Sequence, residues 1–464
     1  MKQLQHILIA ITAILLIGAC SGESYPGITY VYPESEDVTN HESGRVPDLG
    51  IPVKVFLRPQ SFFSISSTRG SGPLDVPSQN RADSNRYEKS LFYIYAFRHA
   101  SDDQGFAPAD LTKRSGDVKD AQANCLVDGP TYPYGMPALL AYDRSGEMKM
   151  KALTPFVRDT TLHYSYYYQD IGYNFFAYYL DDAAIKEEHR TQENITFDFE
   201  LDGSQDIMYG HAPHLSPSVL NEQYANIQLT TEQRYHVLNT GDYSSFASHV
   251  GIDPIIDLNH GLTRIQFLAY PGDRSADNIT ITGIELESRY KGHLVAAARS
   301  LNENTLTFDD DRTYLSLKAP NPDGEGTSPY LPLEKGGNTV QWEEGMSENH
   351  WSENPPTRIG GDLLLPTDSV YAMILHYSQK LHEGKNGKRN VSLYYRLPAP
   401  QTEQSLNEYT GKYMYKPGYI YNVKIGVFGL RKIEIGVTIE GQEWESGGEI
   451  TIGPDDEWED GYWD

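Results

Sequence analysis

Ser90-Leu91-Phe92-Tyr93-Ile94-Tyr95-Ala96-Phe97 is a nearly unbroken run of apolar and aromatic residues. Such a run is typical of a central strand that is buried on both faces of its sheet. Similar segments, with turn residues between them, recur at 53–58, 173–179, 195–201, 263–269, 279–284, 370–375, 391–395, 419–425 and 433–439. Period-two alternation is common in these segments and long amphipathic helical runs are few, so the sequence predicts an all-β protein.

The chain is long enough, at 464 residues, for two domains of ordinary size. Many short strands with loop-rich connections favour two β-sandwich domains over an α/β arrangement. A divide near residue 250 gives halves of similar size, so we expect one domain at 49–250 and a second at 251–452. Short helices are predicted at Asp181–Arg190 and Pro217–Ala225, and an acidic tail at 453–464.

The first residues have the pattern of an export signal. Lys2 belongs to a short cationic start, and the apolar run 7–17 is shorter than the roughly 20 residues that span a bilayer core. The run ends in Ile17-Gly18-Ala19-Cys20, which resembles the lipobox of bacterial lipoproteins, in which the cysteine is acylated and becomes the new N-terminus. We therefore expect a signal peptide at 1–20, a lipid such as palmitate on Cys20, and a flexible polar tether at 21–48. The alternative is an ordinary signal peptide with a chance cysteine.

Composition narrows the class of protein. The formal net charge of −26 argues against nucleic-acid binding, because no basic patch offsets that field near a phosphate backbone. Only two cysteines are present, so if Cys20 carries lipid no intramolecular disulfide forms and packing must hold the fold together. The 34 tyrosines outnumber the 15 phenylalanines, which supports sheets with half-buried surfaces.

No motif predicts an enzyme, a cofactor or a metal site. His211 and His214 are close in sequence, but Pro213 argues against a helix that presents both, so a surface loop is favoured over a metal site. The run Asp309-Asp310-Asp311 lacks the alternating ligands of a calcium loop and is interpreted as a solvated acidic turn. Cys125 has no neighbouring histidine or basic residue to activate it and is expected to be an inert thiol. The paired carboxylates of a glycoside hydrolase stay an open alternative, because the acidic residues are too many to single out a pair.

Several stretches, taken in their order along the chain, resemble those of a known protein family. Besides the lipobox and the aromatic strand 92–97, they are 174–179 (Asn-Phe-Phe-Ala-Tyr-Tyr), 205–210 (Gln-Asp-Ile-Met-Tyr-Gly), 260–267 (His-Gly-Leu-Thr-Arg-Ile-Gln-Phe), 281–284 (Ile-Thr-Gly-Ile), 417–423 (Pro-Gly-Tyr-Ile-Tyr-Asn-Val) and 444–448 (Trp-Glu-Ser-Gly-Gly). Together they resemble the fimbrillin family of Bacteroidales, the Mfa-like and FimA-like lipoprotein pilins. The resemblance implies two transthyretin-like β-sandwich domains in tandem, a role in adhesion, and subunits that assemble by strand exchange.

In that family a trypsin-like protease cuts after an arginine that follows the first strand, and a strand from a neighbouring subunit fills the groove. Here the candidate displaced strand contributes Val53, Val55 and Leu57. Arg69, in a loop of small residues, is the candidate processing site. The other possibilities are cleavage at Arg58, Arg81 or Arg86, or a loop arginine that is never cut.

Two C-terminal segments are candidate donor strands. Their alternating apolar residues are Ile433, Ile435, Val437 and Ile439 in the first and Ile450 and Ile452 in the second. Gly447 and Gly448 offer a hinge between them. The alternative is that both strands fold back within their own domain.

These observations predict a non-enzymatic structural subunit of a fimbria, exported as a lipoprotein to the cell outer membrane and exposed on the surface. A stalk or tip subunit is favoured over a basal anchor, because Arg69 lies where processing is needed. The expected partners are other fimbrial subunits, the outer membrane through the lipid, and receptors on host or bacterial surfaces, with no cofactor, metal or nucleic acid. A surface glycan-binding lipoprotein that does not polymerise is the alternative from another class, and a secreted hydrolase is a weaker third.

Overall fold

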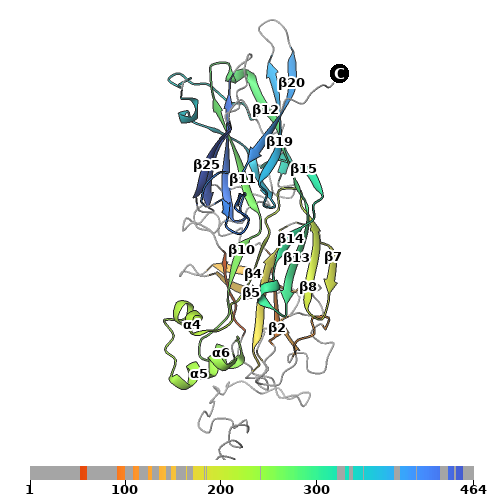
Figure 1. Ribbon diagram of the computed structural model, residues 1–464, viewed down its shortest axis with the longest axis vertical. Helices are drawn as coiled ribbons and strands as arrows, with labels where there is room; N and C mark the ends of the chain where they lie inside the picture. The colour runs from red at the N-terminus through yellow and green to blue at the C-terminus, as the bar shows by residue number, and fades with distance from the viewer. Residues whose placement is uncertain are drawn as a thin grey trace, which may run out of the picture. The chain divides into compact units, whose positions relative to one another are not determined.

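The computed structural model describes residues 53–59, 91–99, 108–113, 124–127, 135–142, 148–152, 164, 171–181, 183, 185–240, 242–320, 330–333, 338–348, 350–380, 387–403, 405–428, 437–443 and 446–452 (Figure 1). The predicted signal peptide, tether and acidic tail lie outside these residues. Among the described residues, no helix has the length and apolar character needed to cross a membrane.

The first sheet has eight strands: β1 (Phe56–Pro59), β2 (Leu91–Arg98), β3 (Cys125–Val127), β4 (Met136–Tyr142), β5 (Met148–Ala152), β6 (Tyr173–Tyr179), β9 (Met208–His211) and β10 (Ile255–His260). Their order is β3-β2-β4-β5-β1-β10-β9-β6, and β6 also pairs with β2. The strands from β2 through β1 to β6 therefore close into a ring of pairings. Each strand of such a ring has a neighbour on both sides, which removes the reactive edges of an open sheet.

A second, four-stranded sheet has the order β14-β13-β8-β7. Its strands are β7 (Ile185–Arg190), β8 (Asn194–Glu200), β13 (Lys291–Ala298) and β14 (Leu306–Phe308), which lie side by side in Figure 1. Apolar and polar residues alternate along β8, so that Ile195, Phe197 and Phe199 are all buried. They share one hydrophobic core with residues of β2 and β6, where the rings of Tyr178 and Phe197 are 5.3 Å apart. This period-two alternation of burial is the one expected of a strand with one face on the core.

The C-terminal part contains two further sheets, ordered β18-β11-β23-β24-β25 and β15-β12-β19-β20. Their strands are β11 (Thr263–Pro271), β12 (Ile279–Arg289), β15 (Arg312–Ser316), β18 (Thr357–Leu365), β19 (Val370–Lys380), β20 (Lys388–Pro398), β23 (Tyr419–Val427), β24 (Val437–Glu443) and β25 (Ser446–Ile452). Two short pairs, β16 (Lys318–Pro320) with β17 (Tyr330–Pro332) and β21 (Leu406–Asn407) with β22 (Lys412–Tyr413), complete the strands. The two sheets enclose a second core, in which the ring of Tyr415 makes a tilted contact with Tyr371 and an edge-to-face contact with Tyr421. The all-β prediction is thus confirmed.

Three short α-helices lie together beside the first sheet (Figure 1). They are α4 (Pro217–Gln223), α5 (Thr231–Thr240) and α6 (Ser245–His249), and single 3-10 turns occur at Ala276–Asn278, Leu301–Glu303 and Trp351–Glu353. The helix predicted at Pro217–Ala225 is confirmed, because Ser216 caps it and Pro217 opens it. The helix predicted at Asp181–Arg190 is wrong: Ile185–Arg190 is β7, an edge strand that pairs with β8. Cross-strand partners override the helix propensity of its Lys and Glu residues, as in the ion pair of Lys186 with Glu200.

Strand pairing crosses residue 250, where the sequence suggested a divide. β10, β13 and β14 lie beyond that residue, yet β10 pairs with β1 and β9, and β13 pairs with β8. The chain enters the C-terminal sheets with β11 and β12, returns with β13 and β14, and leaves again with β15. Leu364 of β18 and Ile420 of β23 also pack into the core of the first two sheets.

Candidate functional site

The strand β1 is the centre of the candidate site, because it holds the residues that the sequence marked as a displaced first strand. It is four residues long and runs parallel to β10 and antiparallel to β5. In register, Leu57 faces Ile256 of β10 and Met148 of β5. The backbone N–H of Phe56 donates a hydrogen bond to the carbonyl of Pro254 at 2.9 Å.

The apolar side chains of this segment are buried. Val53, Val55 and Leu57 are 6%, 2% and 0% exposed, whereas Lys54 between them is exposed. The strand itself begins only at Phe56, so the alternation of buried and exposed side chains continues upstream of the paired residues. Burial of each such side chain contributes roughly 1.5–3 kcal/mol. A short segment thus supplies several kilocalories per mole to the first sheet.

β1 closes the ring of strands between β5 and β10, because it pairs with both of them. Its removal would leave β5 and β10 each with unpaired backbone groups along one side, and between them the slot that the buried Leu57 had filled. Unpaired backbone groups are costly when buried and act as a template for another strand when exposed. The slot would therefore accept an extended segment with alternating apolar residues.

Beside the slot, Asp253 precedes β10 and is largely buried. Burial raises the pKa of its carboxyl group, although a hydrogen bond from Ser248 and the charge of Lys54 lower it in part. Lys54 therefore couples the first segment electrostatically to the start of β10. This interaction depends on β1 being in place.

Of the four arginines that are candidates for processing, the structure describes one. Arg58 lies within β1, where its backbone pairs with Asp257, and a protease cannot easily reach a bond inside a sheet ladder. Arg69, Arg81 and Arg86 lie outside the described residues, as does Cys20.

The candidate donor segments are strands of the C-terminal sheet. Val437 and Ile439 lie on β24, which pairs with β23, and Ile450 and Ile452 lie on β25, which pairs with β24. Ile433 and Ile435 lie outside the described residues. In this conformation the described parts of both segments fold back on their own sheet, and β25 is the last strand in its order.

The cysteine, histidines and aspartates that were considered as possible chemical sites in the sequence each have a defined place in the fold. Cys125 is buried on β3, which suits an inert thiol. His211 Nδ1 lies 3.3 Å from Oδ1 of Asn304, and burial lowers the pKa of this histidine. Asp309 and Asp311 contact His293 and Lys291, so the acidic turn forms ion pairs with the neighbouring strand β13. His214 instead contacts Asp242, a residue that no sequence pattern singled out.

An open groove of about 870 Å³ lies on the sheet of β12, β15, β19 and β20. Polar side chains, among them Ser316 of β15 and Ser392 of β20, line it together with apolar ones such as Leu331. Tyr314 and Tyr394 are exposed and stand two residues from these serines, so they lie on the same face as the groove. The face combines polar groups with exposed aromatic rings.

Comparison with known proteins finds likeness only at the level of structure. No protein-family model and no curated protein matches the chain. It is similar to the solved structure of a "putative cell adhesion protein" from Bacteroides uniformis, with 10% identity, 86% of this chain and 100% of that chain covered, and a TM-score of 0.39. A second protein so described, from Bacteroides ovatus, has 11% identity, coverage of 85% and 96%, and a TM-score of 0.37. The fimbrial anchor protein Mfa2 from Porphyromonas gingivalis has 13% identity, coverage of 85% and 98%, and a TM-score of 0.30.

Two of these solved structures are thus described as "putative cell adhesion" proteins and the third as a fimbrial anchor protein. Identities this low bear on the fold alone, and the low TM-scores add no argument about assembly or ligands.

Proposed function

We propose that this chain is a structural subunit of a fimbria, in the stalk or at the tip, and that it assembles by strand exchange. The observation that carries the proposal is the position of β1, a four-residue strand with buried apolar side chains that completes a ring between β5 and β10. A strand of that length is easily lost once the chain is cut behind it. Its loss opens a slot with two unpaired edges that a strand from another subunit can fill.

The C-terminal segments supply a fitting donor. Val437, Ile439, Ile450 and Ile452 alternate with polar residues in the way that the slot requires. β25 is held by one neighbouring strand, β24, whereas β1 lies between two. Exchange therefore releases fewer pairings at the donor end than it creates in the acceptor.

In this proposal the chain is exported as a lipoprotein through Cys20 and held at the outer membrane until a protease cuts after Arg69. The cut separates the lipid together with β1 from the rest of the chain. The partners are other fimbrial subunits, and adhesion to host or bacterial surfaces is the role of the polymer. A basal anchor would keep both the lipid and β1.

The test is the N-terminus of the protein in material sheared from the cell surface, determined by mass spectrometry. A start at Gly70 in a detergent-resistant polymer supports the stalk or tip subunit. A start at acylated Cys20 in a monomer contradicts it and favours the anchor. Arg69→Ala should abolish polymer, whereas the matched control Arg86→Ala should leave the polymer intact.

A second candidate function, a glycan-binding surface protein that does not polymerise, is favoured by the groove beside Tyr314 and Tyr394. Exposed aromatic rings next to polar groups suit the apolar and polar faces of a sugar. Binding to a glycan array that Tyr394→Ala removes would support it. Tyr235→Ala is the matched control, because Tyr235 is also exposed but lies on α5.

A further inference from the structure

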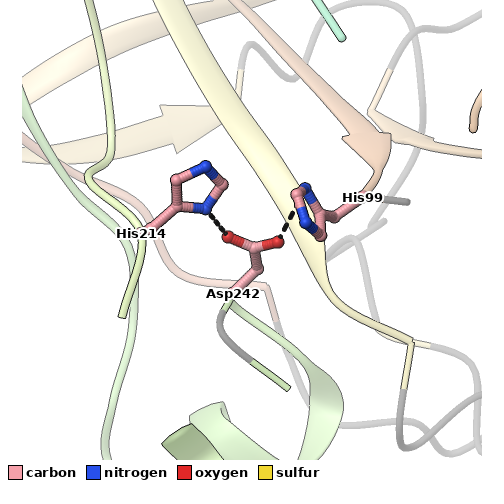
Figure 2. Close-up of side chains that lie close together, drawn as sticks. All are labelled: His99, His214 and Asp242. Atoms are coloured by element: carbon pink, nitrogen blue, oxygen red, sulfur yellow. Dashed lines mark hydrogen bonds and ion pairs between the residues drawn. The ribbon is translucent and has the colours of Figure 1, made fainter. Parts of the chain in front are cut away.

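Three side chains from separate parts of the chain meet beside the helices (Figure 2). His99 directly follows β2, His214 lies between β9 and α4, and Asp242 lies between α5 and α6. Nδ1 of His214 contacts Oδ1 of Asp242, and Nδ1 of His99 lies 3.0 Å from Oδ2 of the same carboxylate. The nitrogen and oxygen atoms that these three residues offer lie within 4.8 Å of one another.

The carboxylate is the buried centre of this cluster. The Asp242 side chain is 2% exposed, whereas the His99 and His214 side chains are 30% and 48% exposed. A buried carboxylate without a positive or hydrogen-bonding partner for each oxygen is costly. The two oxygens of Asp242 are not equally satisfied: Oδ2 has no hydrogen-bond donor among the described residues, although His99 Nδ1 is near.

The amide of Asn174 also contacts the ring of His99. Nδ2 of Asn174 lies 3.3 Å from Nδ1 of His99 and 3.3 Å from the carbonyl oxygen of Arg299. The carbonyl accepts one amide hydrogen, which orients the amide, and the second hydrogen then points at the ring nitrogen. In the tautomer in which Nδ1 of His99 accepts this hydrogen bond, that nitrogen carries no proton and its lone pair can bind a metal ion.

We propose that His99, His214 and Asp242 bind one divalent transition metal ion of the zinc type. A divalent cation binds imidazole nitrogens and a carboxylate oxygen at the same time, and here it would give the buried Oδ2 of Asp242 a partner. Two imidazole nitrogens and one carboxylate are a common donor set for zinc, with the fourth position open to water. The partial exposure of both histidines provides that open position and a path for entry.

The site would fasten the helical segment to the first sheet. His99 extends from a strand of the ring, whereas Asp242 belongs to the segment that carries α5 and α6. A backbone bridge between Tyr173 and Tyr243 already joins the two at the residue next to Asp242. The metal would add a side-chain link at the same place, so its effect should be on local stability.

A second group, Glu187, His189 and Asp198, also places three ligand atoms close together. It lies on the open face of β7 and β8, where His189 and Glu187 are 48% and 67% exposed. Asp198 there already accepts hydrogen bonds from two histidines, His189 and His293. This group has no buried ligand, so it serves as the control.

The test uses the full chain stripped of metal with EDTA and titrated with zinc chloride at pH 7.5 by calorimetry. We expect one zinc ion per chain, and a loss of affinity of about 100-fold or more in His99→Gln, His214→Gln and Asp242→Asn. Zinc should raise the melting temperature of the wild type and of His189→Gln, but not of the three site variants. Cobalt(II) should give the visible absorption bands of a tetrahedral site in the wild type and in His189→Gln, but not in the three site variants.

Three results would overturn the proposal. They are the absence of one-to-one binding, binding that survives all three site substitutions, and binding that is lost in His189→Gln instead. Circular dichroism of each variant separates loss of the site from loss of the fold. Imidazole nitrogens must be free of protons to bind a metal, so protons should compete with zinc and the affinity should fall between pH 7.5 and pH 5.5.

Discussion

Arg264 of β11 donates two hydrogen bonds, from Nε and Nη2, to a single oxygen of Asp362 on β18, at 3.2 and 3.0 Å. Both side chains are buried, with exposures of 0% and 2%. Arg358 reaches the other oxygen of Asp362 from the same strand. The pair lies where the register between the two strands shifts, so it joins them at an irregular point of the ladder.

Loss of one member of this pair should destabilise the protein strongly. Asp362→Ala leaves a buried guanidinium without its carboxylate, which costs about 3–5 kcal/mol. The double variant Arg264→Met, Asp362→Leu should cost less than the single one, because no buried charge is left. Urea unfolding measures both. The exposed pair of Lys186 with Glu200 is the control, and Glu200→Ala should change stability by no more than about 1 kcal/mol.

Gly210 should not tolerate a side chain. A Cβ at this position on β9 would lie 2.0 Å from the backbone oxygen of Asp257 on β10. Backbone cannot move aside as a side chain can, so Gly210→Ala should destabilise the protein by at least roughly 1–3 kcal/mol. Gly283→Ala is the comparison, because its Cβ would meet only the side chain of His376, at 3.1 Å. Equal melting temperatures for the two variants would contradict this expectation.

Asp253 should make the protein less stable as pH rises. Burial raises its pKa above the ordinary value of 3.8, so the unfolded chain ionises first and is stabilised relative to the folded one. The stabilising effect is complete below the unfolded pKa and is lost as pH rises through the folded pKa. Asp253→Asn cannot ionise, so its stability relative to the wild type should increase from pH 3 to pH 7. A difference in unfolding free energy that does not change with pH would exclude this role.

His293 should stabilise the protein at mildly acidic pH and lose this effect as the pH rises further. Its hydrogen bond with Asp198 raises the pKa of His293, and hydrogen bonds from His293 and His189 lower the pKa of Asp198 despite its partial burial. The stabilisation is present below the unfolded histidine pKa and is lost as pH rises through the folded value. His293→Gln should therefore be less stable than the wild type near pH 5, with a difference that shrinks by pH 8. Titration of the His293 ring by NMR would show the raised pKa directly.

Leu57 should matter in the unassembled chain and not in the polymer. Leu57→Ala creates a cavity at a fully buried position and should cost the monomer about 2–5 kcal/mol. If strand exchange replaces β1, the same substitution should leave the dissociation temperature of assembled fimbriae unchanged. Equal losses in monomer and polymer would show that β1 stays in place. Lys54→Ala, at the exposed neighbour, is the control for the monomer.

The two helices predicted from the sequence show what a local pattern can and cannot predict. Ser216 and Pro217 start a helix wherever the chain allows one, because a cap and a proline satisfy the first turn locally, and α4 forms as predicted. Ile185–Arg190 has residues that suit a helix, but it pairs with β8 and forms an edge strand. Its conformation depends on a partner, and a partner is not visible in a local pattern.

The sequence by itself determined the all-β class and the burial pattern of the first segment. Val53, Val55 and Leu57 occupy every second position, and a strand with one buried face must place them all on that face. Only the tertiary structure decided that β1 lies between β5 and β10, that strands beyond residue 250 join the first two sheets, and that Asp242 lies between His99 and His214. Alternation is a property of neighbouring residues, whereas strand partners and clusters of side chains depend on the free energy of contacts between segments far apart in the chain.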